Sequence, residues 1–323
     1  MVGGFMKVRV LYHDHCFDGA ASAAYFSRFC SNYFGNGAEF AYTGMAHKAS
    51  QLFEESLFDG DENAIVDFKY SSSDRVTWWF DHHQSAFLSH EDQLDYERKK
   101  DHRRYYFDPK YRSCTEFIAH IGRTVYNYEA PDLADLVQWA GIIDGANYNS
   151  ADEAVHMQEP AMKLTLLIEA VRGSEMVQKV IRMMQRQSLA EIMAEPEVQS
   201  VFQPLWERHL NSIDVIRRVG HCADGVIYFD VADYDMEGYN KFVPYSLFPE
   251  ATYTVSVSRA SFRTKVSVGS NPWAPSTPTH NLATICERYG GGGHPRVGAI
   301  SFERNELEQA RRVAHEVAEE LRG

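Results

Sequence analysis

The sequence predicts an α/β protein with a doubly wound, mostly parallel sheet in an N-terminal domain, followed by a smaller, mixed α/β domain. Short β-rich segments in the first quarter of the chain each end in a cluster of polar residues, and a helical segment follows the first of them. Strands that alternate between apolar and polar residues appear only in the last third. The chain has 323 residues, and a single hydrophobic core stops growing near roughly 250–300 residues, so we expect two domains.

Three β-rich segments predict strands of the first sheet. They are residues 7–15 (KVRVLYHDH), 63–71 (NAIVDFKYS) and 76–85 (VTWWFDHHQS). Small and then aromatic residues at 19–29 are typical of a helix that packs closely on a sheet. A strand, a tight turn and a helix begin a βαβ unit, and in open α/β sheets ligands bind outside the carboxyl ends of the strands. We therefore expect the polar clusters to converge at that edge.

Helical patterns fill much of the remaining first domain. Residues 113–122 have Ser113 or Thr115 as the candidate cap, residues 131–143 lead directly into Asp144, and residues 160–194 contain no interior proline. The segment 89–108 is different, because it is densely charged and has little periodicity. We expect it to be a solvated excursion from the fold. The alternative is a phosphate-binding role for its basic residues, Arg98, Lys99, Lys100, Arg103 and Arg104.

The boundary between the domains is predicted near two prolines. Residues 196–212 combine these prolines with a polar mixture and are expected to form a linker, with domains at 1–195 and 213–323. The second domain contains alternating, strand-like segments at 225–233, 251–259 and 262–270. A closing helix is predicted from one apolar face that comprises Leu307, Ala310, Ala314, Val317 and Leu321.

Net charge limits the classes of partner. The chain has 32 Lys and Arg residues against 45 Asp and Glu residues, so its formal charge is −13. This is the wrong sign for a protein that grips long duplex nucleic acid through many phosphates. A short or small anionic substrate needs only a local positive site, which bound metal ions can supply.

The cysteines and apolar segments indicate the compartment. Five scattered cysteines without any CxxC pair argue against a disulfide framework or a zinc ribbon. The N-terminal segment lacks a signal-peptide pattern, and no segment reaches about 18 uninterrupted apolar residues. We therefore expect a reduced, cytoplasmic protein with no membrane partner. Its oligomeric state stays open, with a homodimer as one option.

Residues suited to metal binding stand at the ends of the predicted elements. In chain order they are His13, His15, Cys16, Asp18, Asp67, Asp81, His82, His83 and Asp144. Carboxylates and imidazoles together suit Mn²⁺, Zn²⁺ or Fe²⁺, and a carboxylate shared by two ions is common in two-metal phosphotransfer sites. A single aspartate after a strand is more often a turn former. The joint pattern is what favours a metal site.

Five motifs together resemble the DHH/DHHA1 phosphoesterases, in particular the branch of nanoRNases and 3′-phosphoadenosine 5′-phosphate phosphatases. They are LYHDHCFDGAAS (11–22), IVDF (65–68), FDHHQS (80–85), WAGIIDG (139–145) and GGGGHPRVGA (290–299). The resemblance covers nearly the whole chain. It implies a DHH domain that binds two divalent ions, most often Mn²⁺, and a DHHA1 domain that closes over the substrate in a cleft.

The resemblance also implies roles for individual residues. Asp67 would bridge the two ions and take part in catalysis. Asp18, His82 and Asp144 would complete one metal site, and His13 would belong to the other. Asp81 would orient a ligand histidine, and His83 would contact the scissile phosphate.

Cys16 departs from the family pattern, because many members have an aspartate at this position. A thiolate is a softer ligand than Mn²⁺ prefers. Three explanations remain open: Cys16 is a bystander, His15 replaces it as a ligand, or the site favours zinc or iron. We keep Cys16 among the candidate ligands.

The glycine run in the C-terminal motif predicts substrate binding. Consecutive glycines let the backbone approach a ligand and direct amide groups at an anion, although a bare glycine run is more often a flexible loop. Arg259 resembles the family's phosphate-binding arginine, and its alternative is a surface residue at a strand end. The predicted substrate-binding residues are Gly291, Gly292, Gly293, His294 and Arg259.

The resemblance implies a hydrolase that cleaves phosphoesters with water activated by two metal ions. Among substrates, short oligoribonucleotides rank first, followed by 3′-phosphoadenosine 5′-phosphate as a small nucleotide and then a cyclic dinucleotide. An exopolyphosphatase-like activity is a further alternative. The rival from another class is a non-catalytic, metal-dependent binding protein that retains one ion.

Overall fold

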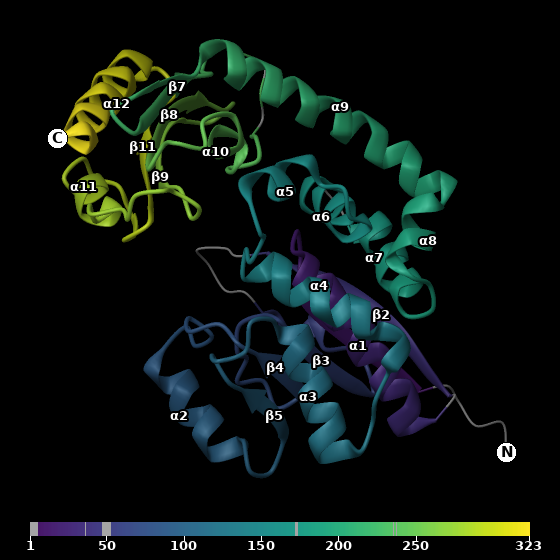
Figure 1. Cartoon of the computed structure of the whole chain (residues 1–323). Coiled ribbons are helices and arrows are strands. Elements are labelled where there is room, and N and C mark those ends of the chain that lie inside the picture. Colours follow the sequence, from purple (N-terminus) through teal and green to yellow (C-terminus); the bar gives the residue numbers. More distant parts are fainter. Residues whose placement is uncertain (1–5, 36, 47–52, 172–173, 235, 237) are drawn as a thin grey trace, which may run out of the picture. The chain divides into compact units, whose positions relative to one another are not determined.

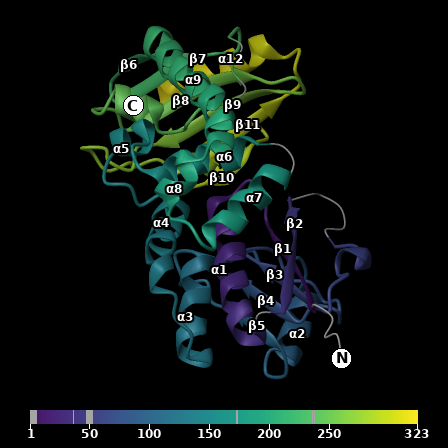
Figure 2. The same ribbon diagram turned by 90° about the vertical axis from the view of Figure 1, so that its right-hand side faces the viewer.

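The computed structural model describes residues 6–35, 37–46, 53–171, 174–234, 236 and 238–323 (Figures 1 and 2). The chain divides into two compact units, each with its own sheet. Unit 1 comprises residues 1–147 and 158–205, and unit 2 comprises residues 148–157 and 206–323. No helix within the described residues is both long and apolar enough to cross a membrane.

Unit 1 is built on a parallel sheet of five strands in the order β2-β1-β3-β4-β5. The strands are β1 (Met6–His13), β2 (Ala38–Met45), β3 (Glu62–Val66), β4 (Trp78–Asp81) and β5 (Arg104–Phe107). Strand β2 lies on one side of β1, and β3, β4 and β5 follow on the other side, so the strand order reverses between β1 and β3. Other doubly wound sheets of this strand order have the same reversal. The predicted fold class is confirmed.

Helices and buried aromatic residues cover both faces of this sheet. The α-helices of unit 1 are α1 (Phe17–Phe34), α2 (His90–Lys99), α3 (Cys114–Tyr126), α4 (Ala134–Asp144), α6 (Pro160–Ala170), α7 (Ser174–Met184) and α8 (Leu189–Ala194), with 3₁₀ turns at Glu55–Leu57 and Pro131–Leu133. Helix α1 packs against α3, α4 and α7 (Figure 1). On β4, Trp78 contacts Phe26 of α1, whereas Trp79 points to the other face and contacts Tyr96 of α2.

The charged segment 89–108 is part of the fold, so the prediction of a solvated excursion was wrong. A capping box between Ser89 and Asp92 begins helix α2, and β5 pairs with β4 as the edge strand of the sheet. Arg104 forms an ion pair with Glu62, 2.7 Å away, and its guanidinium lies 4.1 Å from the centre of the Trp78 ring. This arginine therefore stabilises the sheet edge.

Unit 2 contains a six-stranded mixed sheet in the order β10-β11-β9-β8-β7-β6, in which only β7 and β8 are parallel among the described pairs. The strands are β6 (His221–Ala223), β7 (Val226–Asp230), β8 (Tyr253–Arg259), β9 (Thr264–Ser270), β10 (Gly292–His294) and β11 (Val297–Phe302). The helices are α5 (Ala151–His156), α10 (Val243–Leu247), α11 (Leu282–Glu287) and α12 (Leu307–Arg322). The predicted face of α12 packs on the valines of β8 and β9 in one core.

The predicted linker, residues 196–212, lies in helix α9 (Pro196–Val219), which contains Pro204 in its interior. The change from unit 1 to unit 2 falls within this helix, after residue 205. Helix α5 also belongs to unit 2, although residues of unit 1 follow it in sequence. Buried His209 of α9 contacts the Val155 carbonyl oxygen at 2.7 Å, and the Asn240 amide donates to the Ala154 carbonyl oxygen at 2.9 Å.

Candidate metal centre

The candidate site lies at the carboxyl ends of the central strands of unit 1. His13 is the last residue of β1, Asp67 follows the end of β3, and Asp81 is the last residue of β4. Because β1 and β3 are the strands between which the sheet reverses direction, a crevice is expected between their carboxyl ends. As expected from the sequence, these polar residues lie together at this edge of the sheet.

Asp67 occupies the centre of this site in an unusual backbone conformation. Its φ angle is 56°, in the left-handed region, and its N–H donates to the Phe80 carbonyl oxygen at 2.9 Å. The residue is 1% exposed, and both carboxylate oxygens are buried without a hydrogen bond from the described residues. The nearest imidazole nitrogens belong to His13 and His82, each 3.4 Å from one of these oxygens. A buried carboxylate of this kind is suited to binding cations.

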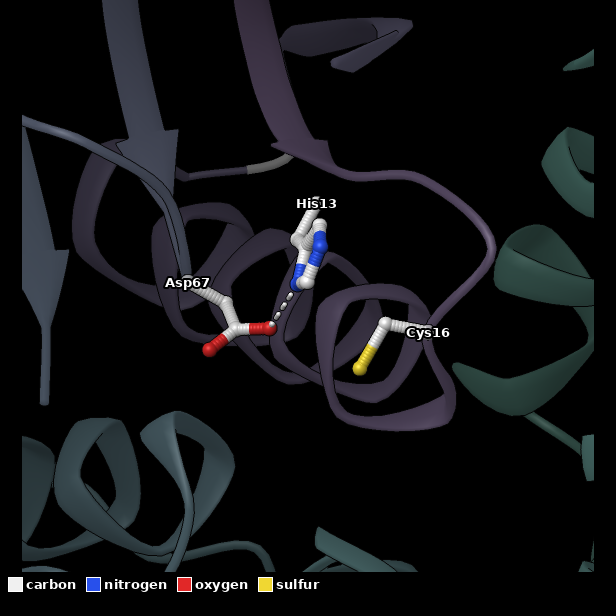
Figure 3. Close-up of side chains that lie close together, drawn as sticks. All are labelled: His13, Cys16 and Asp67. Atoms are coloured by element: carbon white, nitrogen blue, oxygen red, sulfur yellow. Dashed lines mark ion pairs between the residues drawn. The ribbon is translucent and has the colours of Figure 1, made fainter. Parts of the chain in front are cut away.

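Within the described part of the chain, three overlapping groups of side chains can hold a metal ion, and in each group the ligand atoms lie within 4.8 Å of one another. The groups are His13, Cys16 and Asp67; Asp67, His82 and His83; and Asp18, His82 and Asp144. Figure 3 shows the first group, in which the three side chains lie close together. All the predicted metal ligands therefore lie together, and Asp67 is shared by two of the groups.

The N-terminus of helix α3 positions Asp18. The Asp18 carboxylate accepts hydrogen bonds from the backbone N–H of Cys114 at 2.6 Å and of Thr115 at 3.0 Å. The Thr115 hydroxyl donates a third hydrogen bond, at 2.6 Å. Sequence reasoning missed this role of Thr115. The available signal was a candidate cap at the start of a predicted helix, which says nothing about which carboxylate it holds.

The two histidines of the DHH tripeptide have different partners. The Nδ1 atom of His82 lies 3.0 Å from the Tyr111 carbonyl oxygen, and its Nε2 faces Asp18, Asp67 and Asp144 at 3.4–3.7 Å. Asp81 instead contacts the Nδ1 atom of His83 at 2.7 Å. The Tyr111 carbonyl thus orients His82, a role that the sequence did not reveal, while Asp81 orients His83.

Gly19 allows the turn after β1 to bring these ligands together. A side chain on Gly19 would overlap the carbonyl oxygen of His13, so only glycine lets the start of α1 approach the end of β1 this closely. His15, considered as an alternative to Cys16, has a φ of 57° and contacts Asp14. It belongs to none of the three ligand groups formed by the described residues.

The electrostatics of the cluster agree with a cation site. Burial raises the pKa of Asp18 and of Asp144, and the neighbouring charge of Asp67 raises both further. Burial alone would raise the pKa of Asp67 and lower that of His82. Contacts with His13 and with His82 reverse the effect for Asp67, so its pKa lies below its usual range. Contact with Asp67 and the nearby charge of Asp18 reverse it for His82, whose pKa rises to about 10. Without a metal ion, protons supply the positive charge that this cluster of carboxylates requires.

We expect the metal-free protein to lose free energy of unfolding as the pH rises. Asp18, Asp144 and His82 hold protons when folded at pH values where the unfolded chain has released them, so each favours folding less as the pH increases. For His82 this window extends from its ordinary 6.5 to about 10. The measurement is urea unfolding of metal-stripped protein across this pH range. Over the same range, the His82→Gln variant should lose less free energy of unfolding than the wild type. Stability that is constant or rises over this window would contradict the assignment.

The glycine run lies in unit 2, in a hairpin formed by β10 and β11. A side chain on Gly291 would overlap the Ala299 carbonyl oxygen, and one on Gly293 would overlap that of Val297. Gly290 has a φ of 76°. The hairpin itself therefore requires these three glycines. A methyl group on Gly292 would meet no atom within 4 Å, so this glycine has no such structural requirement.

The other predicted substrate-binding residues of unit 2 are accessible. His294 is exposed at the end of β10. Arg259, at the end of β8, donates to Asp233 at 3.2 Å, and Arg311 also binds this aspartate, at 2.6 Å. The Arg259 side chain is 34% exposed, so it remains free to reach an anion by exchanging this surface ion pair.

Comparison with known proteins shows which solved structures have a similar fold. No family model and no curated protein matches the sequence. Among solved structures, the pGpG-specific phosphodiesterase PggH from Vibrio cholerae matches with a TM-score of 0.72 and 16% identity, over 98% of each chain. The DHH domain of a protein described as belonging to a family of ribosomal proteins matches with a TM-score of 0.57 and 10% identity, over 96% of this chain and 86% of that one.

A third structure, an exopolyphosphatase-related protein from Bacteroides fragilis, matches with a TM-score of 0.52 and 14% identity, over 99% of this chain and 93% of that one. At these identities the likeness is one of fold. The chain has the fold of DHH proteins, and the predicted resemblance is confirmed at that level. The likeness to PggH extends over both units of the chain.

Proposed function

We propose that this protein is a metal-dependent phosphoester hydrolase that acts on short oligoribonucleotides. The observation that carries the proposal is the overlap of three ligand groups, two of which share Asp67, at the point where the sheet reverses direction. Buried carboxylates and imidazoles in this arrangement suit two divalent ions, with Mn²⁺ as the first candidate. The fold shared with a phosphodiesterase supports the same reaction class.

The residues of the site would have different roles in such a reaction. Two divalent ions held here would supply Lewis acidity for phosphoester hydrolysis. Asp67 would be a ligand to both ions, Asp18, His82 and Asp144 would complete one position, and His13 with Cys16 would complete the other. The contact with Asp81 raises the pKa of His83. A protonated His83 could donate a hydrogen bond to a phosphate oxygen of the substrate.

The proposed substrate is a short, anionic nucleotide chain. PggH is described as specific for pGpG, and its fold matches over 98% of this chain. The formal charge of −13 disfavours a partner that needs many phosphate contacts. We propose that the glycine hairpin, His294 and Arg259 of unit 2 bind an anionic group of this substrate.

The test is release of mononucleotides from a labelled RNA ladder of two to about ten nucleotides in the presence of Mn²⁺. The same assay includes pGpG, a cyclic dinucleotide, 3′-phosphoadenosine 5′-phosphate and polyphosphate, with a chelator-treated sample as control. We expect the shortest oligomers to be cleaved fastest. Cleavage of polyphosphate alone would overturn the substrate assignment. If the protein binds one ion by elemental analysis and hydrolyses none of these substrates, it is a binding protein.

Gly292→Ala provides a direct test of the hairpin. Because the added methyl group meets open space, we expect unchanged thermal stability, whereas the KM for a short oligonucleotide should rise by about tenfold or more if the backbone contacts the substrate. Gly291→Ala is the matched comparison, since its methyl group overlaps the Ala299 carbonyl and should destabilise the fold by about 1–3 kcal/mol. A Gly292→Ala enzyme with normal KM would show that this glycine does not approach the substrate.

A further inference from the structure

Cys16 places a sulfur atom in one half of the metal cluster. The residue lies in the turn between β1 and α1, directly before Phe17, the first residue of the helix. Its Sγ atom, a ring nitrogen of His13 and a carboxylate oxygen of Asp67 all lie within 4.8 Å of one another. In Figure 3 the Cys16 side chain lies beside the Asp67 carboxylate and the His13 ring. The carboxylate of Asp67 is buried, and neither of its oxygens has a hydrogen-bond partner among the described residues, which is typical of a cation position.

The spacing of these three atoms suits a small ion. Zinc bonds of about 2.0–2.3 Å in tetrahedral geometry separate ligand atoms by about 3.3–3.8 Å. The His13 and Asp67 atoms are already 3.4 Å apart, and the sulfur lies within the 4.8 Å limit of the group.

The other half of the cluster has different chemistry. Asp18, His82 and Asp144 offer only oxygen and nitrogen atoms. A second sulfur lies nearby in Cys114, whose N–H binds Asp18, but its thiol is directed to the Phe80 carbonyl oxygen at 3.5 Å. Among the described residues, Cys16 is therefore the cysteine that joins a ligand group.

We propose that the two metal positions are chemically unequal. The position formed by His13, Cys16 and Asp67 has a thiolate ligand and selects zinc or ferrous iron, whereas the position formed by Asp18, His82 and Asp144 takes a harder ion such as manganese or magnesium. Soft thiolate ligands favour Zn²⁺ and iron, and carboxylate ligands suit Mn²⁺ and Mg²⁺. This inference rests on the metal site of the proposed function, but it does not depend on the substrate.

Cobalt provides a spectroscopic test, because a Co²⁺ ion bound to a thiolate has a sulfur-to-metal charge-transfer band in the near ultraviolet. Metal-stripped protein is titrated with Co²⁺, and the band is expected in the wild type and in Cys114→Ser. It should be absent in Cys16→Ser and Cys16→Asp. Cys222→Ser, a half-buried cysteine in unit 2, is a second control if Cys114→Ser does not fold. Wild-type protein that binds cobalt without this band, or a band that survives in Cys16→Ser, would overturn the proposal.

Metal competition measures the selectivity itself. Protein equilibrated with equal amounts of Zn²⁺ and Mn²⁺ is freed of unbound metal, and its bound ions are quantified. We expect bound zinc in the wild type and a shift toward manganese in Cys16→Asp. The loss of zinc affinity should be at least as large as the roughly 10–100-fold loss typical of outer-shell partners. Identical metal contents in the two proteins would refute the selectivity. Inactivity on every phosphoester would instead overturn the proposed function and leave the band and the selectivity in place.

Discussion

Replacing Asp67 with asparagine will remove metal binding and hydrolysis together, while the fold remains. Asparagine has the same shape and tolerates the positive φ of this position, but it removes the negative charge that two ligand groups share. We expect both metal positions to be lost and the rate of hydrolysis to fall by at least about a thousandfold. The measurements are metal content by elemental analysis, steady-state turnover, and circular dichroism to verify folding.

Asp108→Asn is the matched control for this change. Asp108 follows β5 at the same edge of the sheet and accepts a hydrogen bond from the N–H of Lys110, which an asparagine oxygen can also accept. It belongs to none of the three ligand groups, so metal content and turnover should stay near wild type. An Asp67→Asn protein that retains two ions and near-normal turnover would rule out the bridging role of Asp67.

Adding a single methyl group at Gly19 will disrupt the site from outside the ligand set. The methyl group of Gly19→Ala would overlap the His13 carbonyl oxygen, so either the end of β1 or the start of α1 must move. That movement displaces His13, Cys16 and Asp18 relative to Asp67. We expect a loss of stability of about 1–3 kcal/mol and a loss of metal affinity of more than about tenfold. Denaturant unfolding and metal titration measure the two effects separately.

Gly37→Ala controls for the general effect of replacing a glycine in unit 1. A methyl group on Gly37 would meet no atom within 4 Å, so neither stability nor metal affinity should decrease. If Gly19→Ala also binds metal normally, close packing of β1 and α1 is not what positions the ligands.

The features that the sequence revealed depend on local patterns. Apolar segments that end in Asp and His predicted β1, β3 and β4, and the geometry of parallel strands then placed His13, Asp67 and His82 at one edge. The helices α3 and α12 were predicted correctly from their caps and apolar faces. These elements carry their own signal, because each has a buried face that repeats along the chain.

The features that the sequence did not reveal depend on distant partners. Strand β5 is only four residues long and lies among charged residues, and what makes it a strand is its pairing with β4. Helix α9 contains Pro204, which favoured a linker when the segment was considered alone. Much of the support for Asp18 and His82 comes from backbone N–H groups and a backbone carbonyl oxygen near the start of α3. Every residue type has a backbone carbonyl group and every type except proline has a backbone N–H, so no sequence pattern identifies them.

The glycine run shows that one pattern can have two causes. The interpretation from sequence was that these glycines let the backbone approach a ligand. In the structure, Gly291 and Gly293 are required by close contacts within the hairpin itself, while Gly292 is not. The substrate-binding role of the run stays a prediction, and Gly292 is the residue that tests it.

The path of the chain through its two units has a consequence for the order of events during synthesis. Residues 148–157 leave the ribosome before residues 158–205, which complete unit 1. The partners of α5, including His209 and Asn240, are made only later. Because domains generally fold as their residues emerge, unit 1 can fold before the residues that contact α5 have been synthesised. A ribosome that stops shortly after residue 205 would thus release a chain with a folded first unit and an unburied α5, a natural target for chaperones.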